Sequence, residues 1–108
     1  MTVLDISCAE LASRLDANAP IALLDVREDW ELEICAIDQA LHIPLSQLSG
    51  RLDELAPDMP LAIICHHGVR SRHAGLLLED HGFKELFNVR GGIDAWALEV
   101  KRDMSRYD

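Results

Sequence analysis

Residues 61–72 read Leu-Ala-Ile-Ile-Cys-His-His-Gly-Val-Arg-Ser-Arg, and this segment is the most informative one in the chain. Its first four residues form a short apolar run of the kind found in fully buried strands. Apolar residues then recur at helical spacing between Ala74 and Leu78, which predicts a helix that begins near Ser71. A strand, a short loop that starts with Cys65, and a helix are therefore expected to follow one another directly.

The composition of this loop suits a site for a sulfur anion. The thiolate, not the thiol, is the nucleophilic form of cysteine. Free N–H groups and the positive dipole end of the following helix, together with Arg70 and Arg72, favour a thiolate at Cys65. Gly68 lets the backbone bend close to the sulfur, and successive N–H groups in such a loop form an anion-binding concavity. The alternative is a buried structural cysteine, which would not need a glycine-bent loop that carries arginines.

Strand-like and helical segments alternate along the rest of the chain. Apolar runs predict strands at residues 21–25, 41–43, 61–64 and 86–89. Periodicity and capping signals predict helices at residues 7–16, 28–33, 46–55, from Ser71 to Gly82, and after Gly91-Gly92. This alternation indicates an α/β fold with a parallel sheet and helices on both faces. Ligands bind beyond the carboxyl ends of strands in such sheets, and the pattern places Cys65 at one of these ends.

Four segments in the same order resemble the rhodanese (sulfurtransferase) family. Cys65-His66-His67-Gly68-Val69-Arg70-Ser71 resembles the active loop of that family, in which the cysteine is followed by two variable residues, glycine, a variable residue, arginine, and serine or threonine. The family's early strand, the segment before its middle strand and its final Gly-Gly helix resemble residues 23–28, 40–45 and 91–96. The resemblance implies one domain over residues 1–108, with the family's three-layer fold around a mostly parallel sheet of about five strands.

The chain departs from the family pattern at two places. The family commonly has Gly-His-Ile-x-Gly-Ala where residues 35–40 read Cys-Ala-Ile-Asp-Gln-Ala, so two glycines and a histidine are missing. The variable loop positions are His66 and His67, where members active on thiosulfate often carry a further basic residue. The first departure concerns the shape of a turn, and the second leaves the preferred sulfur donor open.

The resemblance implies a sulfurtransferase that works in two steps. Cys65 would take sulfane sulfur from a small anionic donor such as thiosulfate, hold it as a persulfide, and pass it to cyanide, a thiol or a protein acceptor. Loop N–H groups would stabilise the outer sulfur anion, as an oxyanion hole stabilises oxygen. The expected catalytic residue is Cys65, and the expected substrate-binding residues are His66, His67, Gly68, Val69, Arg70 and Ser71. Arg70 would either bind the anionic donor or hold the loop in shape, and Ser71 would cap the helix.

Two other interpretations stay open. One is a non-catalytic rhodanese-like binding or regulatory domain, because a fold alone does not determine function. The other is a cysteine-dependent phosphatase or arsenate reductase, whose loop has about five residues between cysteine and arginine. Only four residues separate Cys65 from Arg70. The shorter loop suits a persulfide, which has one terminal atom to hold.

The composition narrows the class of protein. The 108 residues are 49% hydrophobic and 27% charged, which is typical of a soluble globular domain. The net charge of −9 and the lack of a basic stripe argue against nucleic-acid binding. An anionic donor would therefore have to be attracted by local positive charge around Cys65. No apolar stretch approaches the ~20 residues of a membrane span, so we expect no membrane partner. The expected location is the cytoplasm, and the expected state is a monomer or weak dimer.

The remaining cysteines and histidines do not form a second site. Cysteines at positions 8, 35 and 65 provide no disulfide framework, which fits a reducing compartment. Cys8 and Cys35 are expected to be structural, with Cys35 as a resolving thiol for oxidised Cys65 as the alternative. Adjacent residues rarely converge on one metal, so Cys65, His66 and His67 predict no metal site, and no cofactor is expected.

Charged residues at the end of the strand at 21–25 are expected to be structural. Asp25 and Arg27 leave a buried strand, where such residues commonly pair with each other or with neighbouring loops. The tail from Lys101 is polar and is expected to lie over the surface. Neither feature predicts catalytic groups beyond the Cys65 loop.

Overall fold

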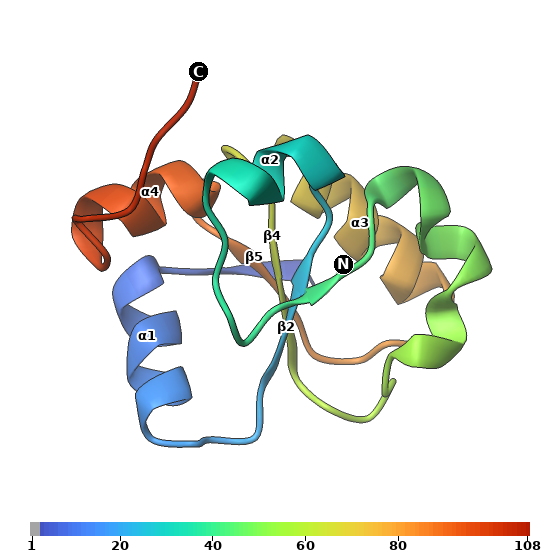
Figure 1. Ribbon diagram of the computed structural model, residues 1–108. Coiled ribbons are helices and arrows are strands. Elements are labelled where there is room, and N and C mark those ends of the chain that lie inside the picture. The colour runs from blue at the N-terminus through green and yellow to red at the C-terminus, as the bar shows by residue number, and fades with distance from the viewer. Residues whose placement is uncertain (1–2) are drawn as a thin grey trace.

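A five-stranded parallel sheet lies between two layers of helices in the computed structural model, which describes residues 3–108 (Figure 1). The strand order is β1-β5-β4-β2-β3, with β4 in the centre, and every pair is parallel. The strands are β1 (Val3–Ile6), β2 (Ala22–Asp25), β3 (Leu41–His42), β4 (Leu61–Ile64) and β5 (Leu86–Val89). The predicted fold class, with about five strands and helices on both faces, is confirmed.

Four α-helices and two short 3-10 segments connect the strands. They are α1 (Cys8–Asp16), α2 (Asp29–Ile34), α3 (Val69–Asp80), α4 (Gly92–Glu99), η1 (Leu45–Gly50) and η2 (Leu52–Glu54). The helices α1 and α4 pack together, while α3 packs against η1 and the sheet. Within residues 3–108, none of the helices has the length and apolar character needed to cross a membrane.

The central strand β4 separates two apolar cores, because successive side chains of a strand point to opposite faces. Leu61 and Ile63 join the core beneath α3 and η1, and Cys65 continues that alternation. Ala62 and Ile64 join the core beneath α1 and α4. All five of these residues are nearly inaccessible to solvent, so the two cores fix the start of the Cys65 loop from both faces of the sheet.

Two elements differ from the sequence-based expectation. The strand β1 is not predicted, because its middle residues, Leu4 and Asp5, are exposed and give no buried run. It forms through its pairing with β5, in which Val3 lies opposite Leu86. Residues 46–55, expected as one helix, form η1 and η2 instead. Gly50 costs helix stability, and Leu48 is the only residue of the two segments that is buried.

Residues 35–40, where the chain departs from the family pattern, form an ordinary turn. Among the described residues the non-glycine residue with a positive φ is Asn18, so none of residues 35–40 adopts a conformation that favours glycine. Cys35 and Ile37 are buried in the core beneath α1 and α4. Buried Cys35 and exposed Gln39 therefore take the places of the two missing glycines without a positive φ.

Candidate active site

Cys65 lies directly after β4, and its sulfur is covered by the loop that follows. The residue is 1% exposed. Gly68 has a φ of +115°, which favours glycine, and its N–H donates to Cys65 Sγ at 3.0 Å. The helix α3 begins at Val69, two residues earlier than predicted. Its first-turn N–H groups, which have no partner within the helix, therefore follow Cys65 by only a few residues. The expected arrangement of strand, bent loop and helix N-terminus is thus present.

Ser71 does not cap the helix, and that prediction is wrong. Gly68 occupies the N-cap position, so Ser71 lies inside the first turn and is fully buried. Its Oγ is 3.3 Å from Cys65 Sγ and donates a hydrogen bond to Oδ1 of Asn88. The amide nitrogen of Asn88 donates to the carbonyl of Gly68 at 3.2 Å. Since Ser71 has one proton and gives it to Asn88, the Cys65 thiol is the donor to Ser71 Oγ in this arrangement.

The N-terminus of α4 holds the other side of the loop. Ile93 N–H donates to the carbonyl of Cys65 at 2.8 Å, and Asp94 N–H donates to the carbonyl of His66 at 3.2 Å. A Cβ at Gly92 would overlap both carbonyl groups, so only glycine allows this close approach. The resemblance of residues 91–96 to the family's Gly-Gly helix thus corresponds to a direct contact with the Cys65 loop.

Arg70 pairs with a carboxylate of α2. Its two terminal nitrogens donate to Glu31 at 2.6 and 2.7 Å, a bidentate geometry. This pair raises the pKa of Arg70. Burial alone would raise the pKa of Glu31, but hydrogen bonds from Arg70, the Glu28 N–H and Tyr107 outweigh it and lower the pKa to about 2. Of the two expected roles of Arg70, this geometry supports the one in which it holds the loop in shape.

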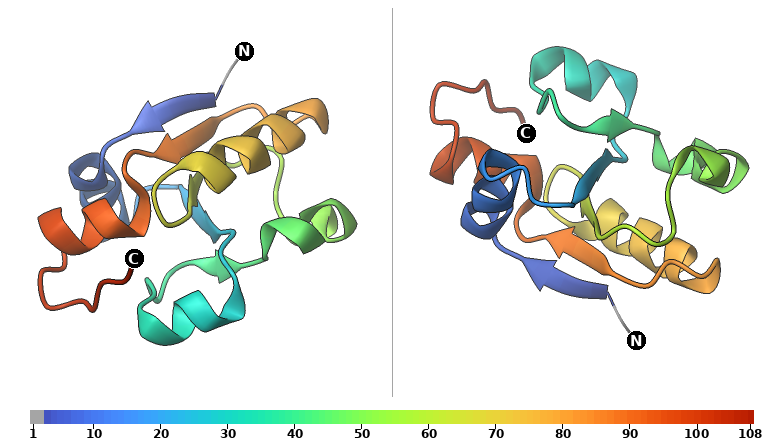
Figure 2. Two further views of the ribbon diagram at one scale, coloured as in Figure 1. Left: turned by 90° about the horizontal axis from the view of Figure 1, so that it is seen from above. Right: turned by 90° about the horizontal axis from the view of Figure 1, so that it is seen from below.

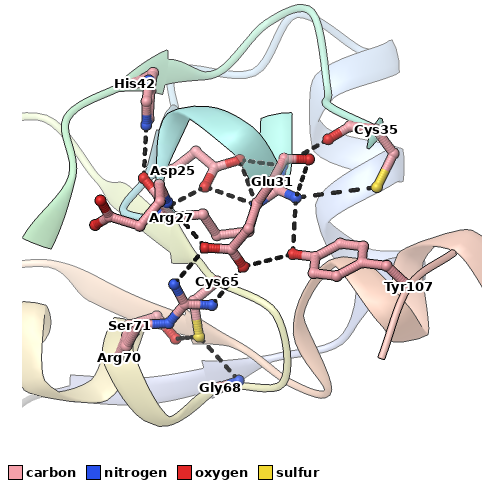
Figure 3. A network of polar contacts seen from close by, with 11 residues as sticks. Asp25, Arg27, Glu31, Cys35, His42, Cys65, Gly68, Arg70, Ser71 and Tyr107 are labelled. Atoms are coloured by element: carbon pink, nitrogen blue, oxygen red, sulfur yellow. Dashed lines mark hydrogen bonds and ion pairs between the residues drawn. The ribbon is translucent and has the colours of Figure 1, made fainter. Parts of the chain in front are cut away.

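A buried network continues from Glu31 to the end of β2 (Figure 3). Arg27 is fully buried and forms an ion pair with Asp25, at 2.8 Å between Nη2 and Oδ2. Its guanidinium also donates to the carbonyl of Cys35 at 2.9 Å and to the hydroxyl of Tyr107 at 3.1 Å. Asp25 and Arg27 therefore pair with each other, as expected, and they connect the sheet to α2 and the C-terminus.

The remaining loop residues face outward to different extents. His66 is half-buried, and its ring stacks between His67 and Tyr107 with centroids 4.0 Å away on either side. His67 is exposed, and Val69 is 67% exposed. Hence His67 and Val69 form the outer rim of the loop, while Gly68 and Ser71 contact the sulfur directly.

The fixed positive charges near Cys65 are largely neutralised. Arg70 is paired with Glu31, and Arg72 forms an ion pair with Asp5 at 2.8 Å. The sequence predicts that these arginines attract an anion, whereas in the structure each faces a carboxylate. Attraction of an anion at short range therefore depends on the N–H groups of the loop and of the first turn of α3.

The two other cysteines belong to the core beneath α1 and α4, whereas Cys65 belongs to the core beneath α3 and η1, and all three are free. Burial, followed by the charge of Glu99, raises the pKa of the Cys8 thiol to about 11, as suits a structural cysteine. Cys35 lies beyond Arg27 and the Tyr107 hydroxyl, on the opposite side of the network from Cys65 (Figure 3). This placement does not support Cys35 as a resolving thiol.

Sequence reasoning missed three residues of the site: Glu31, Asn88 and Tyr107. Asn88 did carry a signal, because a polar residue within an apolar strand must find a partner when buried. Glu31 follows Glu28 at capping-box spacing, which predicts a helix start and not a partner for Arg70. Tyr107 lies in a polar tail without periodicity, and only the folded chain brings it to the loop.

The fold and the loop together define a class of α/β proteins with a cysteine at the carboxyl end of the central strand. A family model, Rhodanese-like domain, matches residues 7–99. The chain belongs to this family.

Several relatives agree with this assignment. "Putative sulfurtransferase YtwF" of Bacillus subtilis is 37% identical over 94% of this chain and 97% of its own length. A protein of Allochromatium vinosum named "Sulfurtransferase" is 34% identical over 86% of this chain and 87% of its own. A solved rhodanese-like domain protein of Staphylococcus aureus covers 100% of both chains at 29% identity, with a TM-score of 0.82. The proteins of Bacillus subtilis and Allochromatium vinosum, which match nearly over their full length, are thus named for sulfur transfer.

Proposed function

We propose that the protein is a rhodanese-type sulfurtransferase that moves sulfane sulfur from a donor such as thiosulfate to cyanide or a thiol through a Cys65 persulfide. The observation that carries the proposal is the buried Cys65 sulfur, which receives the Gly68 N–H at 3.0 Å beside the first turn of α3. The names of the relatives support sulfur transfer in general. A small anionic donor, a thiol or protein acceptor, and a cytoplasmic location belong to the same proposal.

The reaction is a double displacement. The Cys65 thiolate attacks the outer sulfur of thiosulfate, the S–S bond of thiosulfate breaks, and sulfite leaves with the bonding electrons. The outer sulfur stays on Cys65 as a persulfide anion, which the Gly68 N–H and the first turn of α3 stabilise. Cyanide or a thiolate then attacks this outer sulfur, leaves as thiocyanate or as a persulfide, and restores the Cys65 thiolate. This is covalent catalysis with ping-pong kinetics.

The size of the loop supports this reaction over phosphoryl transfer. Four residues separate Cys65 from Arg70, and Arg70 is already engaged by both oxygens of Glu31. A phosphoryl group brings three charged oxygens, which need more donors than a single terminal sulfur does. The loop, whose Gly68 N–H already points at the sulfur, therefore suits a single terminal sulfur better than a phosphoryl group.

The mass of the intact protein after incubation with thiosulfate tests the proposal. We expect a gain of about one sulfur atom in the wild type, lost on addition of cyanide, as covalent catalysis requires. Cys65→Ser should gain nothing. Cys8→Ser is the matched control, because the same atom is exchanged in a buried cysteine outside the site, and it should gain sulfur like the wild type.

No gain with thiosulfate, mercaptopyruvate or polysulfide would refute the proposal and favour the non-catalytic binding domain. Phosphatase substrates would then be tested on the same variants. A gain that persists in Cys65→Ser would assign the chemistry to a different thiol.

A further inference from the structure

The C-terminal residues 101–108, here called the strap, turn back from α4 toward α2 and end beside the Cys65 loop (Figure 2). The strap follows the residues matched by the family model, which end at 99. Most of its residues are exposed, and two partly buried side chains, Met104 and Tyr107, pack onto the core beneath α1 and α4. An exposed ion pair between Arg106 and Asp94 adds a third attachment.

The hydroxyl of Tyr107 forms hydrogen bonds with two residues of the buried network. It donates to Glu31 Oε1 at 2.7 Å and accepts from Arg27 at 3.1 Å. The same Glu31 oxygen accepts from Arg70 at 2.7 Å, so Tyr107 and Arg70 share one carboxylate. Burial, with the neighbouring Glu31 charge, raises the pKa of Tyr107 to about 12, so the phenol remains a donor at neutral pH.

The ring and backbone of Tyr107 hold the residue next to the cysteine. The ring lies parallel to that of His66, with an interplanar angle of 11° and a centroid distance of 4.0 Å. His66 Nε2 donates to the backbone carbonyl of Tyr107 at 2.9 Å. The exposed Trp30 of α2 makes a T-shaped contact with the ring of Tyr107, with centroids 5.8 Å apart. Tyr107 thus joins α2 to the loop.

Tyr107 is connected to the Cys65 loop through two sets of contacts. The first is with His66, which follows Cys65 in the chain, and the second is with Glu31, which in turn binds Arg70. In Figure 3 the guanidinium of Arg70 lies between Glu31 and the Cys65 sulfur. Cys65 is 1% exposed beneath its own loop, and Tyr107 holds His66 of that loop, so a donor or acceptor needs part of this region to move.

We propose that the strap is a lid over the Cys65 loop, latched by Tyr107, and that it selects sulfur donors and acceptors by size. A segment held by a few side chains opens at lower free energy than the sheet beneath it. Small molecules need a small opening, whereas a bulky thiol needs the whole strap to leave. The role of the lid in sulfur transfer rests on the proposed function, but its opening does not.

The test compares alkylation rates of the three cysteines, measured by peptide mass spectrometry, with a small reagent (iodoacetamide) and a bulky one (fluorescein maleimide). In Tyr107→Ala we expect Cys65 labelling by the bulky reagent to rise by about tenfold, and labelling by iodoacetamide to rise less, as local opening predicts. Cys35, which lines a narrow crevice with His66 and Tyr107, should also become more reactive. Tyr107→Phe keeps the stacked ring and loses the hydroxyl, so it should lie between wild type and Tyr107→Ala.

Cys8 is the internal control, because it is 1% exposed and its thiol contacts the carbonyls of Arg90 and Gly92, although it shares a core with Tyr107. Unchanged Cys8 labelling shows that the rest of the fold is intact. If Cys8 labelling rises in Tyr107→Ala, the same labelling rates are measured in Arg106→Gln. This variant releases only the exposed ion pair between Arg106 and Asp94. Equal rises for both reagents, or no rise at Cys65 in an intact variant, would overturn the proposal. Labelling requires no sulfur transfer, so this result and the persulfide result are independent.

Discussion

Glu31 is the residue on which the loop, α2 and the C-terminus converge. Its carboxylate is 3% exposed and accepts from Arg70, from Tyr107 and from the Glu28 N–H. A buried carboxylate is stabilised only by such a complete set of donors. The charge of Glu31 therefore matters both for the position of Arg70 and for the stability of the fold.

Glu31 makes the stability of the protein depend on pH in the acid range. Its pKa is about 2 in the folded chain against an ordinary value of 4.5, so its stabilisation is complete above about pH 4.5. It is lost as the pH falls toward 2. Glu31→Gln should lower the free energy of unfolding at pH 7 by about 2 kcal/mol, since Arg70 loses its charged partner. The decrease in stability below pH 4.5 should also become shallower, as measured by urea unfolding across pH.

Glu54→Gln is the matched control for this prediction. Glu54 also pairs with an arginine, Arg51, at 2.7 Å, but both side chains are more than a third exposed. Exposed ion pairs contribute little to stability. Equal effects of the two substitutions would show that the buried network is not what stabilises the loop.

At the level of elements, the N-terminus of α4 and the Cys65 loop form one unit. Two N–H groups of α4 bind the carbonyls of Cys65 and His66, and the backbone at Gly92 touches the loop. The carbonyls are thereby directed toward α4. This contact joins β4, α3 and α4 at the carboxyl edge of the sheet, where ligands bind in folds of this type.

Gly92→Ala should disrupt this unit. The glycine has a φ of +62°, and a Cβ would overlap the loop carbonyls. Gly82→Ala is the control, because Gly82 also has a positive φ, +89°, but a Cβ there meets nothing within 4 Å. We expect Gly82→Ala to lose about 1–2 kcal/mol from backbone strain alone. Gly92→Ala should lose clearly more, measured by chemical denaturation, and equal losses would exclude a steric role of the contact.

For the whole molecule, the net charge opposes the approach of the proposed anionic donor. The net charge is −9, and the arginines near Cys65 are paired with carboxylates. Such a field repels an anion until it comes close enough to meet the N–H groups of the loop. At long range the net charge of the molecule therefore repels an anion, whereas at short range the N–H groups of the loop attract it.

Salt should therefore accelerate the first step of the proposed sulfur transfer from thiosulfate. Raising the ionic strength from about 0.02 M to about 0.3 M shortens the range of the repulsion, and we expect the rate of persulfide formation to rise by about twofold or more. Stopped-flow or quenched-flow mass measurements give this rate. Labelling of Cys65 by the neutral iodoacetamide is the control and should not change. A rate that falls with salt would mean that local positive charge dominates.

Much of the fold is encoded by patterns that lie close together in the chain. Apolar runs predict β2, β4 and β5, and their alternation with helices predicts a parallel sheet. Such patterns do not predict the edge strand β1, because Leu4 and Asp5 are exposed and the strand forms only through pairing with β5. The start of α3 also differs, because Gly68 takes the N-cap position in place of Ser71.

Neighbouring residues are enough to encode the strand, the cysteine, the glycine bend and the following helix. The surroundings of the sulfur, in contrast, depend on the tertiary structure. Glu31, Asn88 and Tyr107 reach the loop from positions 39, 17 and 41 residues away from their loop partners, Arg70, Ser71 and His66. No local propensity encodes such contacts, since they arise when the sheet brings α2, β5 and the C-terminus to one edge. The buried polar groups then pair because isolated charges and donors are costly in the interior.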